Sequence, residues 1–394
     1  MPQICRRVDC IVGARPNFVK IAPIMRALAA YPAIRARLIH TGQHYDLNMN
    51  AVFFDELDIP APDIQLGIGS ASAVRQTAQI MMALEPVWTD ERPDLVLVVG
   101  DVNSTLAAAL TAARLRVPIA HVEAGLRSHD DAMPEEINRV ITDRLSDLLF
   151  VTERSAIQNL IREGISAGKI VFSGNVMIDT LRDYLDRAVP AAHVLAEISG
   201  NSGEAEQAST NGFGLVTLHR PANLEDGERL KQALAALAAI SQRIPLVFPL
   251  HPRTKASLEG SALMPILAEG SIIIAPPLSY LRSIGLMKEA KFVITDSGGI
   301  QEETTALGTP CFTFRDNTER PITIEQGTNT LVGTSAFRLI EAVETLLSGG
   351  GKKGSIPEKW DGKAAIRIAD GIAEFFAPQA VGPQHDARGE PVAA

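Results

Sequence analysis

The chain of 394 residues is poor in cysteine and has no long apolar run. Its three cysteines make a disulfide framework unexpected, and Cys5 and Cys10 would lie on opposite faces of a strand, which argues against a shared metal or redox role. No stretch reaches the roughly 18 apolar residues of a membrane-spanning helix. The N-terminus has neither a long apolar core nor a small-residue cleavage site. We therefore expect a cytoplasmic protein without a membrane partner.

An excess of positive charge is also absent. The chain has 37 Lys and Arg residues against 46 Asp and Glu, a net charge of −9, which argues against nucleic acid as the main partner. Any anion site must therefore be local. The composition, 46% apolar and 21% charged, is that of an ordinary globular protein, and the length predicts two domains or possibly three.

Several catalytic and cofactor motifs are missing. No Gly-x-Gly-x-x-Gly follows the first strand and no Gly-Lys-Ser/Thr loop occurs, which argues against a nicotinamide dehydrogenase and a P-loop ATPase. A Gly-x-Ser-x-Gly elbow, a His-Glu-x-x-His helix and paired Cys-x-x-Cys motifs are absent too. We therefore expect no metal site, no serine nucleophile and no cofactor.

What the chain does contain is short, β-branched apolar runs alternating with helix-length segments. The predicted strands are 8–12, 37–40, 95–99, 119–123 and 148–151 in the first half, and 214–218, 246–250, 272–275, 292–295 and 311–314 in the second. This alternation predicts two α/β domains, each a doubly wound parallel sheet covered on both faces, that face each other across a cleft.

The domain boundaries follow from the changes in composition. We expect an N-terminal domain over 1–176, a C-terminal domain over 177–361, and a helix near 362–377 that returns to the first domain. The polar stretch 200–212 predicts a mobile loop, and 378–394 a disordered tail.

Two strand-to-helix junctions in the second half have the composition of a phosphate site. His219 and Arg220 follow the first strand there, and Ser297, Gly298 and Gly299 follow the fourth. At such junctions unpaired backbone N–H groups and the positive end of a helix bind phosphate. Two of them in one chain imply a diphosphate held in a cleft.

The first half offers cations for the same ligand. Gly13 permits a tight turn after the first strand, and Arg15 and Lys20 follow it. The alternative is a solvated turn with two surface charges. Because ligands bind at the carboxyl ends of the strands in a doubly wound sheet, we interpret both side chains as phosphate contacts.

Carboxylates gather at the same sheet edge. Asp101 and Glu123 each follow an apolar strand, although Asp101 with Ser104 behind it also fits a helix N-cap. Glu135 and Arg139 are four residues apart on a helix, where a surface ion pair is the alternative. Several carboxylates beside cations are costly unless they are paired or used, and we interpret them as catalytic.

Together these motifs resemble one known family, the non-hydrolysing UDP-N-acetylglucosamine 2-epimerases. The likeness spans roughly residues 8–376 and rests on Gly13-Ala14-Arg15-Pro16 with Lys20, Thr41-Gly42-Gln43-His44, Gly100-Asp101, 121–127, 134–139, Gly174-Asn175, His219-Arg220, 296–303 and 315–321. The family has two Rossmann-like domains of the glycosyltransferase-B type, which agrees with the strand pattern.

The resemblance implies inversion at C2 of a UDP-sugar in two stages. A base removes the C2 proton while UDP leaves C1, giving a 2-acetamidoglucal, and UDP then adds back after the opposite face of C2 is protonated. This reaction interconverts UDP-N-acetylglucosamine and UDP-N-acetylmannosamine without a cofactor. The resemblance also implies a homodimer that supplies precursors of cell-surface polysaccharides.

The likeness also implies roles for individual residues. Asp101, Glu123 and Glu135 match the acidic residues of proton transfer, and His219 matches a histidine near the diphosphate. The residues assigned to substrate binding are Arg15, Lys20, Arg139, Ser297, Gly298 and Gly299, with Glu303 as the ribose contact.

Two departures from the family pattern bear on regulation and specificity. Tyr45-Asp46 follows Gln43-His44 where many bacterial members have Arg-Glu, and this region belongs to a second nucleotide-sugar site in members activated by their substrate. Whether this chain is activated in that way stays open. Pro221-Ala222-Asn223 follows His219-Arg220 in place of Arg-Glu-Asn, a change that concerns the diphosphate loop or the sugar accepted.

Four alternatives remain at this point. One is an epimerase for a 2,3-diacetamido uronic acid, which would need a further cation near C6, with Arg127 as the candidate. A second is a hydrolysing epimerase that releases free N-acetylmannosamine. A third is a glycosyltransferase of the same fold, which would not exchange the C2 proton. A nucleotide-sugar sensor is the fourth, and it would have little use for the three carboxylates.

Overall fold

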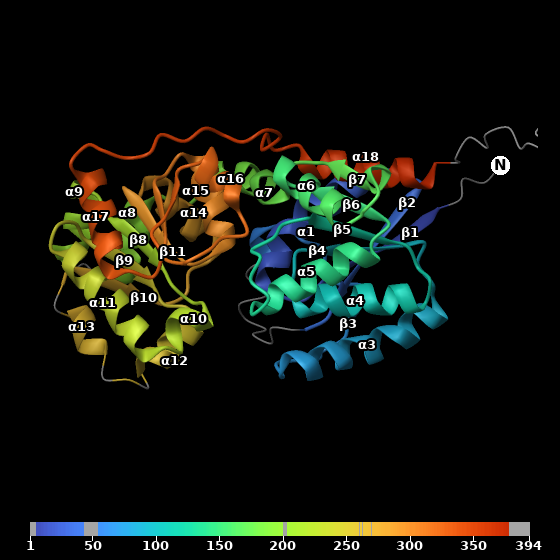
Figure 1. Cartoon of the computed structure of the whole chain (residues 1–394), viewed down its shortest axis with the longest axis horizontal. Coiled ribbons are helices and arrows are strands. Elements are labelled where there is room, and N and C mark those ends of the chain that lie inside the picture. Colours follow the sequence, from blue (N-terminus) through green and yellow to red (C-terminus); the bar gives the residue numbers. More distant parts are fainter. Residues whose placement is uncertain are drawn as a thin grey trace, which may run out of the picture.

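The computed structural model describes residues 5–42, 54–199, 203–259, 261, 263–268 and 270–377. Figure 1 shows two α/β lobes side by side. The segment with Gln43, His44, Tyr45 and Asp46 and the predicted tail 378–394 lie outside the described residues. No helix in the described ranges is long and apolar enough to cross a membrane.

The first lobe contains a seven-stranded parallel sheet in the order β3-β2-β1-β4-β5-β6-β7. Its strands are β1 (Arg6–Val12), β2 (Ile34–His40), β3 (Ile64–Gln65), β4 (Leu95–Val99), β5 (Ile119–Ala124), β6 (Leu148–Val151) and β7 (Ile170–Phe172). The order reverses between β1 and β4, so the loops that follow these two strands border a crevice.

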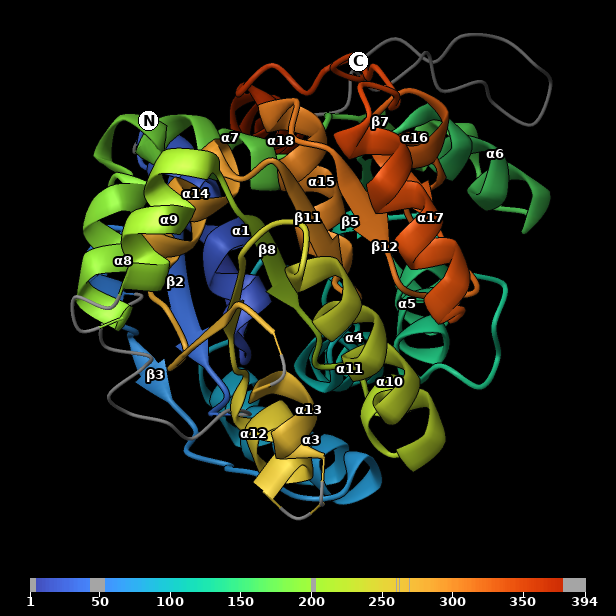
Figure 2. The ribbon, with the colours of Figure 1, turned by 90° about the vertical axis from the view of Figure 1, so that its left-hand side faces the viewer.

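The second lobe repeats this topology in a six-stranded parallel sheet of order β10-β9-β8-β11-β12-β13. Its strands are β8 (Gly214–Thr217), β9 (Leu246–Pro249), β10 (Ile272–Ala275), β11 (Phe292–Thr295), β12 (Cys311–Thr313) and β13 (Asn329–Leu331). Figure 2 shows β8, β11 and β12 in the nearer lobe. The predicted pair of doubly wound sheets is confirmed, although the short strands β3 and β13 were not predicted.

Helices cover both faces of the two sheets, as the near-continuous apolar strands require. Those of the first lobe and the junction are α1 (Arg15–Leu28), α3 (Ala73–Asp90), α4 (Asn103–Arg114), α5 (Pro134–Leu145), α6 (Arg154–Arg162), α7 (Val176–Tyr184) and the 3₁₀ turns η1 (Ala167–Lys169) and η2 (Leu185–Arg187). The others are α8 (Ala191–Ser199), α9 (Gly203–Asn211), α10 (Pro221–Leu224), α11 (Gly227–Ser241), α12 (Pro252–Glu259), α13 (Met264–Ala268), α14 (Tyr280–Glu289), α15 (Gly298–Leu307), α16 (Pro321–Glu325), α17 (Ala336–Leu347) and α18 (Ala364–Phe376).

The loop predicted over 200–212 is wrong for most of its length, because α9 occupies 203–211. Ala208 of this helix is buried in the same apolar cluster as Val194 and Leu195 of α8. Packing of one small apolar residue thus outweighs a polar composition that favours a loop.

The last helix lies on the first lobe. Ile368 and Ile372 of α18 share an apolar cluster with Phe18 of α1 and Leu181 of α7. Figure 1 shows the red segment crossing above both lobes before α18. The domain limits at 176 and 361 themselves stay a prediction.

Candidate active site between the two lobes

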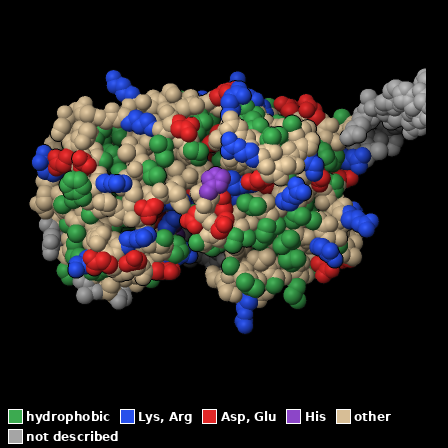
Figure 3. Space-filling model, viewed as in Figure 1, with side chains coloured by type: hydrophobic (Ala, Val, Ile, Leu, Met, Phe, Trp, Pro, Cys, Tyr) green, Lys and Arg blue, Asp and Glu red, His purple; other side chains and the backbone are tan. Residues whose placement is uncertain are grey.

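The predicted site residues lie where the two lobes meet, at the carboxyl ends of the strands. Figure 3 shows acidic and basic side chains gathered in this region. Arg15 begins α1 at this edge, and its side chain lies outside the described part of the structure. The other predicted residues are described below in the order of the strands that carry them.

Glu123 lies at the centre of the charged cluster. It is the second-last residue of β5 and has a left-handed φ of 77°, at the point where the register with β6 shifts. Its side chain is only 4% exposed and forms ion pairs with Lys20 of α1 and with Arg320 of the second lobe. A strained backbone conformation of this kind persists only when its surroundings hold it, and here two cations from different lobes contact the side chain.

Asp101 follows β4 and faces Arg139 of α5. Arg139 Nη2 lies 2.5 Å from Asp101 Oδ2. Burial alone would raise the pKa of Asp101, but the positive charges of Arg139 and Lys20 outweigh it and leave the pKa lowered. The N-cap alternative is wrong, since Val102 occupies the N-cap of α4 without a side-chain bond.

The surface ion pair considered for Glu135 and Arg139 is also wrong. Arg139 is buried and pairs with Glu136 and Asp101 instead. The Glu136 carboxylate further accepts the backbone N–H groups of Ser128 and His129, both at 3.0 Å. Glu135 is half-buried in the first turn of α5. Within the described part of the chain, its side chain has no hydrogen-bond partner.

Asp296 joins the two junctions of the second lobe. This buried carboxylate accepts the backbone N–H groups of His219 at 3.0 Å and Arg220 at 2.9 Å. The Nδ1 atom of His219 lies 3.2 Å from Asp296 Oδ1, and the imidazole is 34% exposed. No role of Asp296 was predicted from the sequence, although its place between β11 and Ser297 indicates a strand-end carboxylate.

The Ser297-Gly298-Gly299 run begins α15. Ser297 is its N-cap, no acidic residue lies in its own first turn, and the carboxylate beside its positive end is that of Glu319. A Cβ atom on Gly298 would lie 2.6 Å from Glu319 Oε1, so a larger residue there would displace the Glu319 carboxylate. The second junction has a shorter helix, because α10 contains four residues.

Glu303 is placed differently from the other predicted contacts. It is buried inside α15 and accepts a hydrogen bond of 2.9 Å from the Tyr280 hydroxyl. Its predicted role as a ribose contact stays a prediction.

A group of charged residues after β12 was not assigned from the sequence. Arg320 is buried and pairs with Glu302 at 2.7 Å as well as with Glu123. Glu319 lies 2.8 Å from Arg315, and although burial opposes it, attraction to Arg320 and Arg315 lowers the pKa of Glu319. Two arginines flanking a glutamate directly after a strand were the available signal.

Glu302, the partner of Arg320, is buried inside α15. Burial raises the pKa of Glu302 to about 8, with Arg320 opposing the shift.

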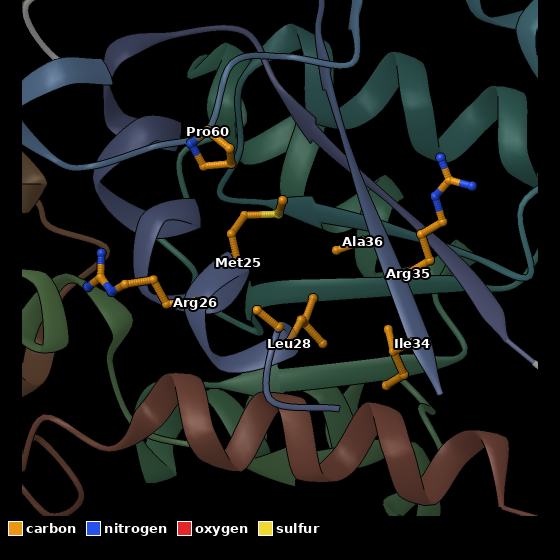
Figure 4. Close-up of a pocket in the computed structure, with 8 residues that line it drawn as sticks. Met25, Arg26, Leu28, Ile34, Arg35, Ala36 and Pro60 are labelled. Carbon is orange, nitrogen blue, oxygen red and sulfur yellow. The ribbon is translucent and has the colours of Figure 1, made fainter. Parts of the chain in front are cut away.

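One cavity of the structure lies elsewhere, between α1 and β2. It measures about 420 Å³ and is lined by Met25, Arg26, Leu28, Ala29, Ile34, Arg35, Ala36 and Pro60. Figure 4 shows Arg26 and Arg35 at its opposite ends. It contains none of the predicted site residues. Among the described residues no group of three or more His, Cys, Asp or Glu side chains could hold a metal ion.

Two facing doubly wound sheets with paired carboxylates and cations between them define an α/β enzyme of the glycosyltransferase-B architecture. The profile of the UDP-N-acetylglucosamine 2-epimerases matches residues 26–373. The chain belongs to the UDP-N-acetylglucosamine 2-epimerase family.

Individual relatives agree with this membership. The UDP-N-acetylglucosamine 2-epimerase of Methanocaldococcus jannaschii is 42% identical over 87% of this chain and 92% of its own length. The UDP-2,3-diacetamido-2,3-dideoxy-D-glucuronate 2-epimerase of Pseudomonas aeruginosa is 41% identical over 94% of this chain and all of its own. A crystal structure of the M. jannaschii enzyme with UDP-GlcNAc and UDP superposes with a TM-score of 0.82 at 40% identity, covering 93% of this chain and 99% of that one.

Proposed function

We propose that the chain is a non-hydrolysing epimerase that inverts C2 of UDP-N-acetylglucosamine to give UDP-N-acetylmannosamine. The observation that carries the proposal is the placement of Asp101 and Glu123 at neighbouring strand ends, with cations from both lobes against them. Elimination across C1 and C2 requires a carboxylate for the proton and cations for the departing diphosphate, and both are present within one cluster.

In the proposed reaction the second lobe binds the diphosphate, and the first lobe supplies the carboxylates that transfer protons. The start of α15 holds the diphosphate through the Ser297 hydroxyl and the backbone N–H groups of Gly298 and Gly299, and His219 donates a hydrogen bond to it. Lys20 and Arg320 leave Glu123 for the diphosphate oxygens as charge develops on UDP. Asp101, Glu123 and Glu135 then transfer protons at the two faces of C2.

Retention of the intermediate accounts for the proposed lack of hydrolysis. The Asn317 amide of the second lobe donates to Asp130 of the first at 3.2 Å, and Arg320 reaches Glu123 across the same boundary. Closed lobes exclude water and keep the glucal beside UDP, so addition of UDP outcompetes addition of water.

The structure bears on the alternative uronate substrate through Arg127. This guanidinium lies 2.6 Å from Glu163 and 2.8 Å from Asp143, and it donates to the Leu126 carbonyl. It is therefore occupied and does not offer a cation to a C6 carboxylate. The full-length match to the P. aeruginosa relative still favours that sugar as a second candidate, and it belongs in the assay.

Proton NMR in D₂O tests the proposal. Purified protein is incubated with UDP-N-acetylglucosamine, and C2 and the anomeric signals are followed together. Deuterium at C2 with appearance of UDP-N-acetylmannosamine supports the proposal, whereas free N-acetylmannosamine and UDP indicate a hydrolysing enzyme. Turnover confined to the 2,3-diacetamido uronate identifies the second candidate, and no C2 exchange with either sugar contradicts the epimerase proposal.

Asp101→Asn separates binding from chemistry. We expect UDP to bind within about twofold of the wild-type Kd, while turnover falls by at least about 100-fold, because the amide cannot accept the C2 proton. Calorimetry and the D₂O assay measure the two effects. Asp131→Asn, at an exposed position before α5, is the control and should leave both unchanged. Unchanged turnover in Asp101→Asn would remove Asp101 from the mechanism.

The cytoplasmic location and the homodimer stay part of the proposal. Light scattering after gel filtration measures the mass of the protein in solution, and a mass of one chain would exclude the dimer.

A further inference from the structure

A buried hydrogen-bond network lies behind the two central carboxylates. His121 is fully buried on β5, two residues before Glu123. Its Nδ1 atom lies 2.7 Å from Asp143 Oδ1 of α5, and its Nε2 atom lies 2.9 Å from the carbonyl oxygen of Gly100. The imidazole thus connects α5 to the turn that carries Asp101.

Both ring nitrogens of His121 donate in this arrangement. The Gly100 carbonyl can only accept, so Nε2 carries a proton. The second oxygen of Asp143 accepts the N–H of Gly125 at 3.0 Å and a guanidinium N–H of Arg127 at 2.8 Å. Because Oδ2 already accepts from these two donors, we take Asp143 as a carboxylate that accepts a hydrogen bond from Nδ1. Burial alone would raise the pKa of Asp143, but His121 and Arg127 outweigh it and leave the pKa lowered.

The network contacts the two turns that have left-handed backbone. Gly100 has a φ of 66° and immediately precedes Asp101, while Glu123 and Gly125 have φ values of 77° and 78°. A left-handed glutamate relaxes unless its neighbours hold it. His121 holds the Gly100 carbonyl on one side, and Asp143 holds the Gly125 N–H on the other.

We infer that His121 and Asp143 are positioning residues that fix Asp101 and Glu123 at the spacing that C2 proton transfer requires, an inference that rests on the proposed function. The parallel strands β4, β5 and β6 are already joined by their own backbone ladder. Buried ion pairs add little net stability once desolvation is included, so a network of this kind is better explained by geometry than by stability.

Two substitutions at His121 separate its two hydrogen bonds. The Asn amide in His121→Asn takes the place of Nδ1 and can donate to Asp143, while the Gln amide in His121→Gln takes the place of Nε2 and can donate to Gly100. We expect each to lower kcat by about 100-fold, since a misplacement of about 1 Å at reacting groups has that effect. The Kd for UDP should stay within about twofold, because neither Lys20, Arg320 nor the start of α15 is a hydrogen-bond partner of His121.

The C2 deuterium isotope effect distinguishes positioning from simple loss of folded protein. If the carboxylates are misplaced, proton abstraction becomes rate-limiting and the isotope effect on kcat rises. A lower fraction of folded enzyme would reduce kcat without changing the isotope effect. Asp143→Asn should behave like the His121 variants, and Glu163→Gln is the control, since Arg127 keeps its contact with Asp143.

A readout without turnover keeps this inference separate from the proposed function. Nitrogen-15 NMR of the wild type should show a proton on both ring nitrogens of His121, and a ring with one bare nitrogen would overturn the inference. If the wild type turns over but the His121 variants show an unaffected kcat or an unchanged isotope effect, the inference is overturned as well. The proposed epimerase function would then still stand. Absence of C2 exchange in the wild type would instead remove the proposed function, and the positioning role with it.

Discussion

At the scale of single residues, Glu123 shows how strongly the site depends on compensated charge. Lys20 and Arg320 both contact its carboxylate in a region closed to solvent. Removing one member of a buried ion group leaves the others uncompensated, which costs more than the group contributes when complete. The proposed function uses the same feature, since the diphosphate would replace the carboxylate as partner of both cations.

Glu123→Gln should therefore be less stable than the wild type by about 3 kcal/mol, because two cations lose their carboxylate. UDP should raise its Tm by more than it raises that of the wild type, because the diphosphate restores the missing negative charge. Thermal unfolding with and without UDP measures both effects. Glu358→Gln, in an exposed pair with Arg154, is the control. An equal or smaller gain from UDP in Glu123→Gln would contradict placement of the diphosphate beside Lys20 and Arg320.

At the scale of elements, the connection of α18 to the first lobe depends on one side chain of α7. Asp179 is buried and accepts the backbone N–H groups of Ala364 at 3.1 Å and Ala365 at 2.7 Å, the first two residues of α18. The carboxylate thus satisfies N–H groups that have no partner within the helix.

Asp179→Ala should destabilise the protein by about 1 to 3 kcal/mol, because two buried donors lose their acceptor. The loss should be concentrated in α18, so hydrogen exchange of its amides should accelerate more than that of β4. Asp183 lies on α7 like Asp179, but it is half-exposed and pairs with Arg26 of α1. Asp183→Ala should therefore cost less than about 1 kcal/mol. Uniform acceleration across the first lobe would show that Asp179 does not act through α18.

At the scale of the whole molecule, the boundary between the lobes contains a buried carboxyl group at Glu153. A cavity of about 90 Å³ beside it is lined from the first lobe by Glu153 and Phe172 and from the second by Ile322 and Glu325. Glu153 is 1% exposed, and burial raises its pKa to about 7, with the Ser155 hydroxyl and Arg320 opposing the shift.

This shift predicts how stability depends on pH. The folded pKa lies above the ordinary value of 4.5, so the contribution of Glu153 is present at low pH and is lost as pH rises through about 7. Glu153→Gln should therefore gain Tm relative to the wild type between about pH 5 and about pH 8. Scanning calorimetry at both pH values tests this, with the exposed Glu85→Gln as control. A Tm difference that shrinks as pH rises would contradict it.

The sequence by itself determined the two doubly wound sheets, because buried parallel strands require continuous β-branched runs that are visible in any window of a few residues. It also determined the edge at which Asp101, Glu123 and Lys20 gather, because all parallel strands of a sheet end on the same side. Family membership follows from motifs of the same local kind.

The tertiary structure alone decided which charges meet. Spacing along α5 favoured a pair between Glu135 and Arg139, whereas the fold turns Arg139 inward to Glu136 and Asp101. The contact of Arg320 with Glu123 joins residues 197 positions apart and exists only because the lobes close on each other. Ion pairs between residues so far apart in the sequence depend on the relative placement of the two sheets, which no local pattern of residues encodes.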